Sequence, residues 1–335
     1  MNFVVSLIVA AVLQGIPLLY GATGEIITEK SGNLNLGIPG IMYVGGISGI
    51  VGSFLYENAM HGAPLNPFLG IFIPLICSLI GSSLMGLIYC FLTITLRANQ
   101  NVTGLALTTF GTGLGSYLGQ TLTKLANSDT PDISLSATGA LFRSSFPQFP
   151  ERIRWIGNVF FSYGLLTYLS IFIAIFAAYF LKKTRPGLHL RAVGENPATA
   201  DAVGINVTAY KYGATIIGSA IAGLGGLHFV MEYLPGLWSS AGFGDRGWLA
   251  IAIVIFAIWR PSLAIIGSIL FGGLYILGVK LTGPIASVFG AGTTDIFKMT
   301  PYVVTIVVLI ISSIRNRREN QPPASLGLPY FREER

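Results

Sequence analysis

Residues 68–96 read FLGIFIPLICSLIGSSLMGLIYCFLTITL, and this run contains no charged side chain. A helix needs about 20 mostly apolar residues to cross the hydrocarbon core of a bilayer. The run therefore predicts a membrane-spanning helix. Pro74 lies inside it and leaves open a second interpretation, in which the chain enters the membrane, turns and leaves on the same side.

Similar apolar runs occur along the whole chain, and we predict nine spans, within a range of eight to ten. The eight others are Phe3 to Tyr20, Leu36 to Tyr56, Val102 to Leu122, Asn158 to Leu181, Tyr212 to Met231, Gly247 to Trp259, Ser262 to Leu281 and Pro301 to Ile314. The first run has no basic segment before it and is longer than the apolar core of a signal peptide, so we interpret it as a retained span.

The composition excludes an ordinary soluble enzyme. Of the 335 residues, 52% are hydrophobic and 10% are charged, whereas about a quarter are charged in a soluble domain. The 42 glycines lie mostly within apolar runs, where small residues allow membrane helices to pack closely. Cys77 and Cys90 show no pairing pattern, so we expect neither a disulfide framework nor a zinc site. The predicted fold is an all-α polytopic transmembrane bundle of about 8–10 membrane helices with a short cytoplasmic helix.

Basic residues predict the orientation, because Lys and Arg are enriched in cytoplasmic loops. Two clusters stand out: Lys182, Lys183, Arg185, Arg191 and Lys211 in one loop, and Arg315, Arg317 and Arg318 after the last span. With nine spans, the N-terminus is outside and the C-terminus inside. We predict a transmembrane domain over residues 1–318, with an external loop at 123–157, a cytoplasmic loop at 182–211 and a flexible cytoplasmic tail at 319–335.

The chain shows no energy source of its own. The centres of the spans are almost free of the ionisable residues that serve as proton or ion relays, and His228 with Glu232 at a span end come nearest. No GxxxxGK[ST] phosphate-binding loop is present. If transport is active, its energy has to enter through another subunit.

The cytoplasmic loop contains a well-punctuated short helix. Asn196 is a good N-cap, Pro197 suits the first helical position, residues 198–203 make about two turns, and Gly204 is placed to end them. Ala198, Ala202 and Ile205 form a small, weakly apolar face. This face suits docking into a groove on a cytoplasmic partner, and the alternative is a helix resting on the membrane surface.

A second polar segment, Gly21 to Met42, follows the first span. We expect a bent element that leads into the membrane, since irregular backbone at that depth is tolerated where it lines a cavity. Asn33 and Asn35 would present their amides to a polar solute, and Glu29 and Lys30 would pair to hold the bend. The alternative is a solvated connecting loop at the inner surface.

Three stretches carry a family resemblance: GEIITEKSGNLNLGIPGIM at 24–42, LRAVGENPATADAVGI at 190–205 and GFGDRGWLAIAIVIFAIWRP at 242–261. Together they closely resemble the permease subunits of binding-protein-dependent ABC importers, in the branch for sugars and nucleosides. The likeness extends from about Gly15 to Pro301. The Glu-Lys-Ser-Gly form at 29–32 looks more like the nucleoside importers than the ribose permease.

The resemblance implies a non-enzymatic permease subunit that forms the path for a nucleoside or a related sugar. Its partners would be an ATPase subunit that carries ATP and Mg²⁺, a second related permease, an external binding lipoprotein and the bacterial plasma membrane; it implies neither a cofactor in this chain nor nucleic acid. The implied ATPase-coupling residues are Arg191, Gly194, Glu195, Asn196, Pro197, Ala198, Ala202 and Gly204. The candidate substrate-pathway residues are Glu25, Glu29, Asn33 and Asn35.

Two other classes remain open from the residues themselves. A facilitative channel would move solute without ATP. A membrane-embedded transferase would need paired carboxylates or a metal cluster, and Glu25 with Glu29 is the one pair that the sequence offers.

Overall fold

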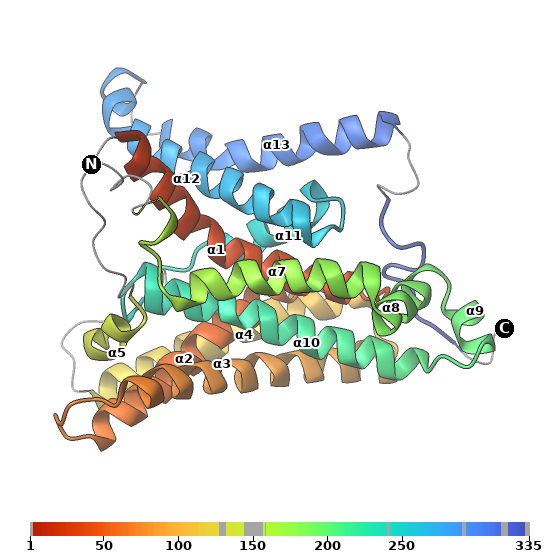
Figure 1. The fold of residues 1–335 in the computed structure, drawn as a ribbon, viewed down its shortest axis with the longest axis horizontal. Helices are drawn as coiled ribbons and strands as arrows, with labels where there is room; N and C mark the ends of the chain where they lie inside the picture. The colour runs from red at the N-terminus through yellow and green to blue at the C-terminus, as the bar shows by residue number, and fades with distance from the viewer. Residues whose placement is uncertain are drawn as a thin grey trace.

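The computed structural model describes residues 3–126, 132–143, 157, 159–239, 242–289, 293–315 and 321–331, and its long helices lie side by side in one bundle (Figure 1). In chain order the helices are α1 (Phe3–Glu29), α2 (Ile38–Ala59), α3 (Pro67–Cys90), α4 (Gln100–Leu125), α5 (Ser136–Leu141), α7 (Leu165–Lys183), α8 (Arg185–Glu195), α9 (Pro197–Ala202), α10 (Val207–His228), α11 (Arg246–Phe256), α12 (Pro261–Phe289) and α13 (Thr293–Arg315). Two short strands, β1 (Ile133–Ser134) and β2 (Leu237–Trp238), pair antiparallel, with Ile133 opposite Trp238.

Each of the nine predicted apolar runs coincides with a helix, which confirms the all-α polytopic fold. Among the described residues, six helices are long and apolar enough to cross a membrane, and Arg246–Phe256 and Met299–Ile310 are shorter apolar helices. The remaining run is α4, a helix of 26 residues that is rich in threonine and glycine.

The run at 68–96 forms one helix that passes through the bundle once. α3 continues past Pro74 to Cys90 and then as a π-helical turn over Phe91–Thr95. The interpretation in which the chain turns back within this run is therefore wrong. A proline inside such a helix is tolerated because close neighbours compensate for the lost backbone bond.

Two predicted spans are longer than their helices. α7 begins at Leu165, after the extended Gly164, whereas the prediction began at Asn158, which lies outside the described residues. α11 has 11 residues and is thus about 16 Å long, too short to cross a bilayer core alone. After it the chain reverses through Ile258 and Trp259, both of which have positive φ angles.

In the sequence, His228 and Glu232 are the residues most like an ion relay. In the structure they stabilise the first turn of α7. Glu232 Oε1 accepts a hydrogen bond from the Leu166 backbone N–H at 2.5 Å, and its Oε2 accepts one from Thr167 Oγ1 at 2.8 Å. His228 Nε2 lies 3.3 Å from Glu232 Oε2. Since the first amides of a helix have no partner within it, this carboxylate acts as a cap supplied by another helix.

Basic residues that are far apart in the sequence lie at the same end of the bundle. Figure 1 shows the N-terminus at one end of the molecule and α8, α9 and the C-terminus at the opposite end. Arg260 borders a groove with Lys182 and Arg191, so it lies at the α8 end. Arg260 thus shares one end of the bundle with the loop at 182–211, and the cytoplasmic position of that end stays a prediction.

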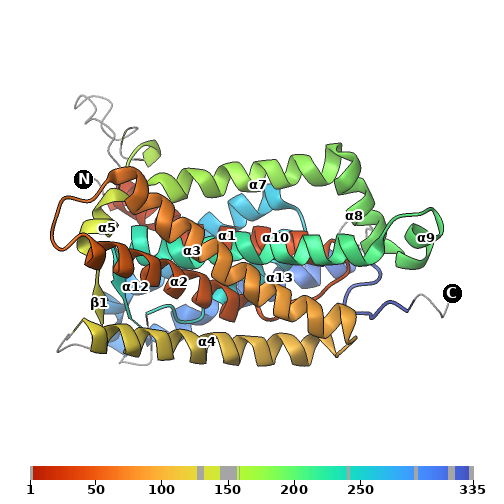
Figure 2. The same cartoon turned by 90° about the horizontal axis from the view of Figure 1, so that it is seen from below.

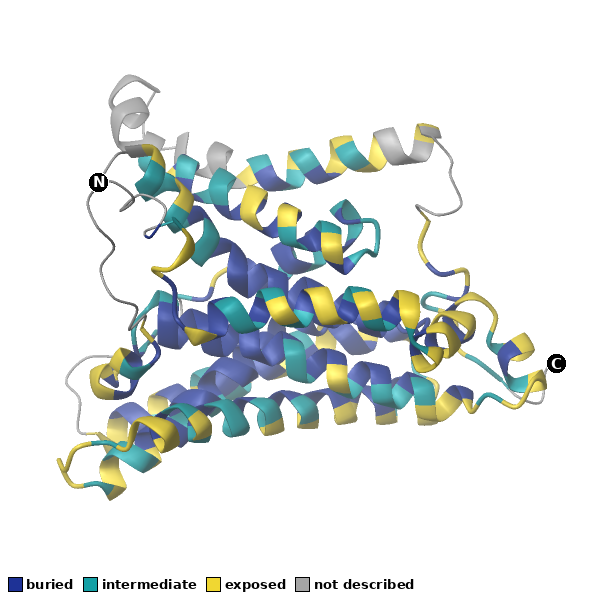
Figure 3. Ribbon diagram, in the orientation of Figure 1, coloured by how far each residue is buried: buried dark blue, intermediate teal, exposed yellow. Residues whose placement is uncertain are grey.

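α1, α2 and α10 form the centre of the bundle. Seen from below, α4 and α7 lie along opposite edges with these helices between them (Figure 2). Buried residues gather on the central helices, whereas exposed apolar residues lie on the outer helices (Figure 3). Exposed apolar side chains on the outside are suited to lipid rather than to water.

Glycines allow the central helices to approach until their backbones touch. A methyl group on Gly226 of α10 would lie 1.8 Å from the Met42 carbonyl oxygen of α2, and one on Gly45 would lie 2.4 Å from Gly223 Cα. On α1, a methyl group on Gly24 would lie 2.2 Å from the Gly218 carbonyl oxygen. These positions have no room for any side chain, so these glycines serve helix packing, as the sequence predicts.

We predict that Gly226→Ala destabilises the protein by about 1–3 kcal/mol, because the added methyl group forces α2 and α10 apart. Gly213→Ala in the same helix is the matched control, since no atom lies within 4 Å of the position that its methyl group would take. Alanine there should be neutral or stabilising by up to about 1 kcal/mol. Thermal unfolding in detergent measures both variants, and equal melting temperatures would show that the close approach is not required.

Candidate functional site

The polar segment after α1 bends later than the sequence predicts. α1 stays helical through Gly21 and Gly24 to Glu29, and the bend is confined to residues 30–37. The expectation of an irregular element from Gly21 onward is wrong, because the glycines there serve close contacts with α10 and α11 rather than a turn. We call residues Lys30–Gly37 the α1–α2 turn.

Polar residues of α1 and the turn bind one another in the interior. The Asn35 backbone N–H donates to Glu25 Oε1 at 2.9 Å, and Asn35 Oδ1 accepts from the Gly37 N–H at 2.9 Å. Glu25 and Asn35 are both fully buried. The alternative of a solvated connecting loop is therefore excluded for these residues, and their hydrogen bonds fix the conformation of the turn.

Glu29 contacts a partner that is distant in sequence rather than its neighbour Lys30. Its carboxylate accepts a hydrogen bond from the indole N–H of Trp259, which lies in the reversal between α11 and α12. The expected Glu29–Lys30 pair is replaced by this contact because α11 brings Trp259 against the end of α1. Burial and the nearby Arg191 guanidinium lower the pKa of Lys30 from its ordinary value.

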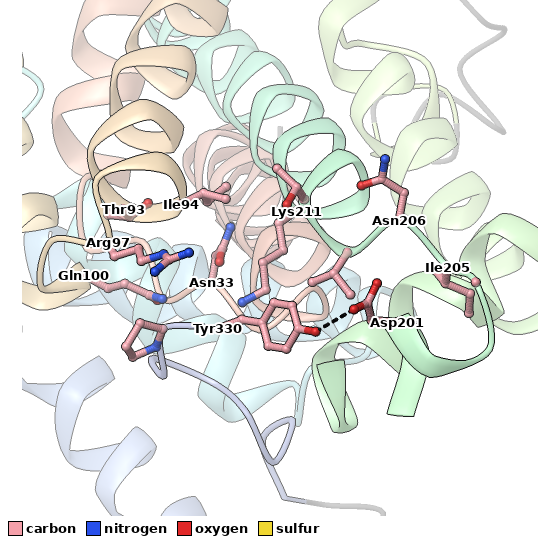
Figure 4. Close-up of a pocket in the computed structure, with 14 residues that line it drawn as sticks. Asn33, Thr93, Ile94, Arg97, Gln100, Asp201, Ile205, Asn206, Lys211 and Tyr330 are labelled. Carbon is pink, nitrogen blue, oxygen red and sulfur yellow. Dashed lines mark hydrogen bonds between the residues drawn. The ribbon is translucent and has the colours of Figure 1, made fainter. Parts of the chain in front are cut away.

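Asn33 is the member of the predicted pathway set that borders a pocket. Its Nδ2 donates to Thr215 Oγ1 of α10 at 3.0 Å, and its Oδ1 has no hydrogen-bond partner among the described residues. The pocket has a volume of about 310 Å³ and lies where α3, α4, α9 and α10 meet near the C-terminal segment (Figure 4). Asn35 and Glu25, by contrast, are engaged with each other.

Side chains of neighbouring helices form hydrogen bonds with the turn. The Leu34 N–H donates to Gln100 Oε1 of α4 at 2.7 Å, and Tyr89 of α3 donates its hydroxyl to the Leu34 carbonyl. Gly32 adopts φ +89°, a conformation that favours glycine. The turn is therefore a joint at which α1, α3, α4 and α10 meet.

The predicted short helix in the cytoplasmic loop is present as α9. Asn196 caps it by accepting a hydrogen bond from the Thr199 N–H at 3.0 Å, Pro197 is its first residue, and Gly204 follows it at φ +85°. A further helix, α8, precedes it and was not predicted. Its N-cap, Thr184, is followed by Arg185-Pro186, and this cap-and-proline pattern is the signal that could have revealed it.

One face of α9 is buried and the other is free. Ala200 packs with Val193 and Val207 in a small cluster that Ile205 also joins. Ala198 and Ala202 are exposed. The predicted face is thus correct for the two alanines and wrong for Ile205, which turns inward because the chain reverses at Gly204.

α8 packs directly on the α1–α2 turn. A methyl group on Gly194 would lie 2.3 Å from the Lys30 carbonyl oxygen, so the two backbones are in contact. Arg191 and Glu195, which flank Gly194 in the predicted coupling set, are exposed. The loop at 182–211 and the candidate pathway segment, which meet at Gly194 and Lys30, 164 positions apart in the chain, therefore form one continuous site.

The C-terminal segment also joins this site. The Ser325 N–H and Oγ both donate to the Gly194 carbonyl oxygen, at 3.0 and 2.6 Å, and the Gly327 N–H donates to the Gly32 carbonyl at 3.1 Å. Tyr330 donates its hydroxyl to Asp201 at 2.9 Å. This arrangement of residues 321–331 differs from the flexible tail that its composition predicts, because backbone groups of α8 and the turn offer it partners.

We predict that Glu25→Ala destabilises the protein by about 1–3 kcal/mol, since the Asn35 N–H loses its acceptor in a buried place. Glu25→Gln keeps an acceptor oxygen at the same position and should unfold close to the wild-type temperature. Thermal unfolding of the two purified variants tests this. A glutamine variant as unstable as the alanine variant would mean that the charge, not the hydrogen bond, holds the turn.

The chain matches one protein-family model and several known proteins. The family model described as "Branched-chain amino acid transport system / permease component" matches residues 7–311. TsgC13 of Haloferax volcanii, a provisionally assigned glucose ABC transporter permease protein, is 31% identical over 99% of both chains. The nucleoside ABC transporter permease protein NupC of Lactococcus lactis is 33% identical over 88% of both chains. The guanosine ABC transporter permease protein NupQ of Bacillus subtilis is 28% identical over 99% of this chain and 98% of its own.

These relatives are permease components, so ATP hydrolysis is not assigned to this chain but to a separate subunit. The apolar helices make the chain a multi-pass protein of the plasma membrane. The match over residues 7–311 covers most of the sequence, and this chain therefore belongs to the family of ABC transporter permease components.

Proposed function

We propose that the chain forms the translocation path for a nucleoside, or for a related simple sugar, in an ATP-driven importer. Relatives named for nucleosides, guanosine and glucose match it over most of both lengths. The family description names branched-chain amino acids, but LivH of Methanocaldococcus jannaschii, named for that transport, matches only 44% of this chain. The Asn33 amide at the pocket suits hydroxyl-bearing solutes better than aliphatic ones.

The proposed assembly contains an ATPase subunit that binds ATP and Mg²⁺, a second related permease and an external lipoprotein that delivers the solute. The exposed alanines of α9 offer the ATPase a surface without protruding side chains. This is the shape that a close helix-in-groove contact needs.

The contact between Gly194 and the Lys30 carbonyl is the observation that carries the proposal. A push on α9 is transmitted through α8, which follows α7 directly and abuts the α1–α2 turn. Because packed interiors deform little, displacement of α8 has to move the turn and its hydrogen-bonded residues. Glu25, Glu29 and Asn35 then serve to keep the turn rigid, and Asn33 faces the open space.

We predict that Ala198→Trp and Ala202→Trp each abolish coupling, because an indole blocks close approach and costs about 1–3 kcal/mol of interface stability. Tyr117→Trp, at an exposed position on α4, controls for the effect of a tryptophan on insertion. Binding-protein-stimulated ATP hydrolysis in the reconstituted complex is the measurement. Wild-type stimulation in both α9 variants would place the coupling surface elsewhere, and uptake without the ATPase subunit would indicate a facilitative channel.

A second prediction concerns the Asn33 amide. Asn33→Ala should lower solute uptake about 5-fold, as expected for the loss of one net hydrogen bond of about 1 kcal/mol, while assembly is retained. Thr215→Val breaks the same internal hydrogen bond but leaves the amide in place, so uptake should remain near the wild-type rate. Equal losses in the two variants would assign Asn33 a packing role. Competition by guanosine, adenosine and ribose in the same assay identifies the solute.

A further inference from the structure

The pocket in Figure 4 contains a buried cation without a counter-ion. The Lys211 side chain reaches from α10 into the pocket, and the residue is only 3% exposed. It makes neither an ion pair nor a hydrogen bond with the rest of the described chain. A buried charge without a partner is costly, so this ammonium group calls for an anion from outside the chain.

Other groups around the pocket also favour a bound anion. Arg97 borders it from the connection just before α4, with its guanidinium 4.6 Å from the ring centre of Phe331. Gln100 Oε1 is occupied by the Leu34 N–H, and Asn206 Oδ1 by the Ala209 N–H. Each of these amides therefore has its NH₂ group left to donate.

Two helix N-termini also meet at the pocket. α10, of 22 residues, begins at Val207, and both Val207 and Thr208 line the pocket. α4, of 26 residues, begins at Gln100, which lines it as well. The N-terminus of a long helix carries partial positive charge and free amides, which favour bound anions.

The lining has little negative charge to oppose this. Asp201 is the one carboxylate among the lining residues, against the two cations Arg97 and Lys211, and it already accepts a hydrogen bond from Tyr330. The pocket thus combines excess positive charge with several donors. At about 310 Å³ it has the volume of a small-ligand site.

We propose that this pocket binds a phosphate group, carried either by a small cytoplasmic ester or by the headgroup of an anionic phospholipid. Lys211 and Arg97 neutralise the charge, and the α10 amides with Gln100 and Asn206 donate to its oxygens. An occupant would contact α9 near Asp201 and Gly204 as well as the ends of α3 and α4, next to the proposed coupling surface. The inference rests on the pocket and not on the solute that the protein moves.

The test uses the full chain purified without phosphate. Inorganic phosphate and adenosine monophosphate are titrated in detergent, and the melting temperature is followed, with potassium chloride at matched ionic strength as the reference. In parallel, the protein is placed in nanodiscs of phosphatidylcholine with or without phosphatidylglycerol. A saturable rise of several degrees with either source supports the site, and the arm that responds identifies the carrier of the phosphate.

Lys211→Met removes the buried charge while keeping an apolar stem of similar length, so it should fold as well as the wild type and lose the response. Arg97→Gln should weaken the response at least about 10-fold in half-saturating concentration. Lys124→Met, at the far end of α4, is the matched control and should retain it. No response beyond that to chloride, or an unchanged response in Lys211→Met, would overturn the proposal.

Discussion

Contact between helix backbones at glycine is the constraint on which the rest of this structure depends. In lipid, helices gain little from burying apolar side chains against one another, so association relies on close packing. At Gly24, Gly45 and Gly226 the central helices approach until no side chain fits between them. This approach removes solvent from the end of α1 and creates the dry interior into which the α1–α2 turn is inserted.

The turn becomes a rigid joint because its polar groups have nowhere else to bond. Asn33 reaches α10, Leu34 reaches both α3 and α4, and Glu29 reaches the reversal after α11. Inside a low-dielectric medium each of these bonds is costly to break without replacement. Movement of α8 against the Lys30 carbonyl is thus passed to several helices at once, which fits the proposed transmission from α9.

Predictions from sequence succeeded where the signal was local. The apolar runs match the helices, and the Asn196–Pro197 punctuation predicts α9 correctly, because capping depends on residues within one turn. They failed where a distant segment decided the outcome. Ile205 turns inward to a cluster built by α8 and α10, and the start of α7 depends on a carboxylate that Glu232 supplies from the π-helical turn after α10.

The sequence by itself determined the membrane class, the positions of the apolar helices and the family, since composition, hydropathy and motifs are properties of short stretches. Only the tertiary structure decided which polar groups meet. Asn33 and Thr215 are 182 positions apart, and Glu29 and Trp259 are 230 apart. No periodicity within a helix specifies such pairs, because they depend on how closely glycine lets the helices approach. The same reason explains why Lys211, which in the sequence is one basic residue among five in its loop, ends in a buried pocket.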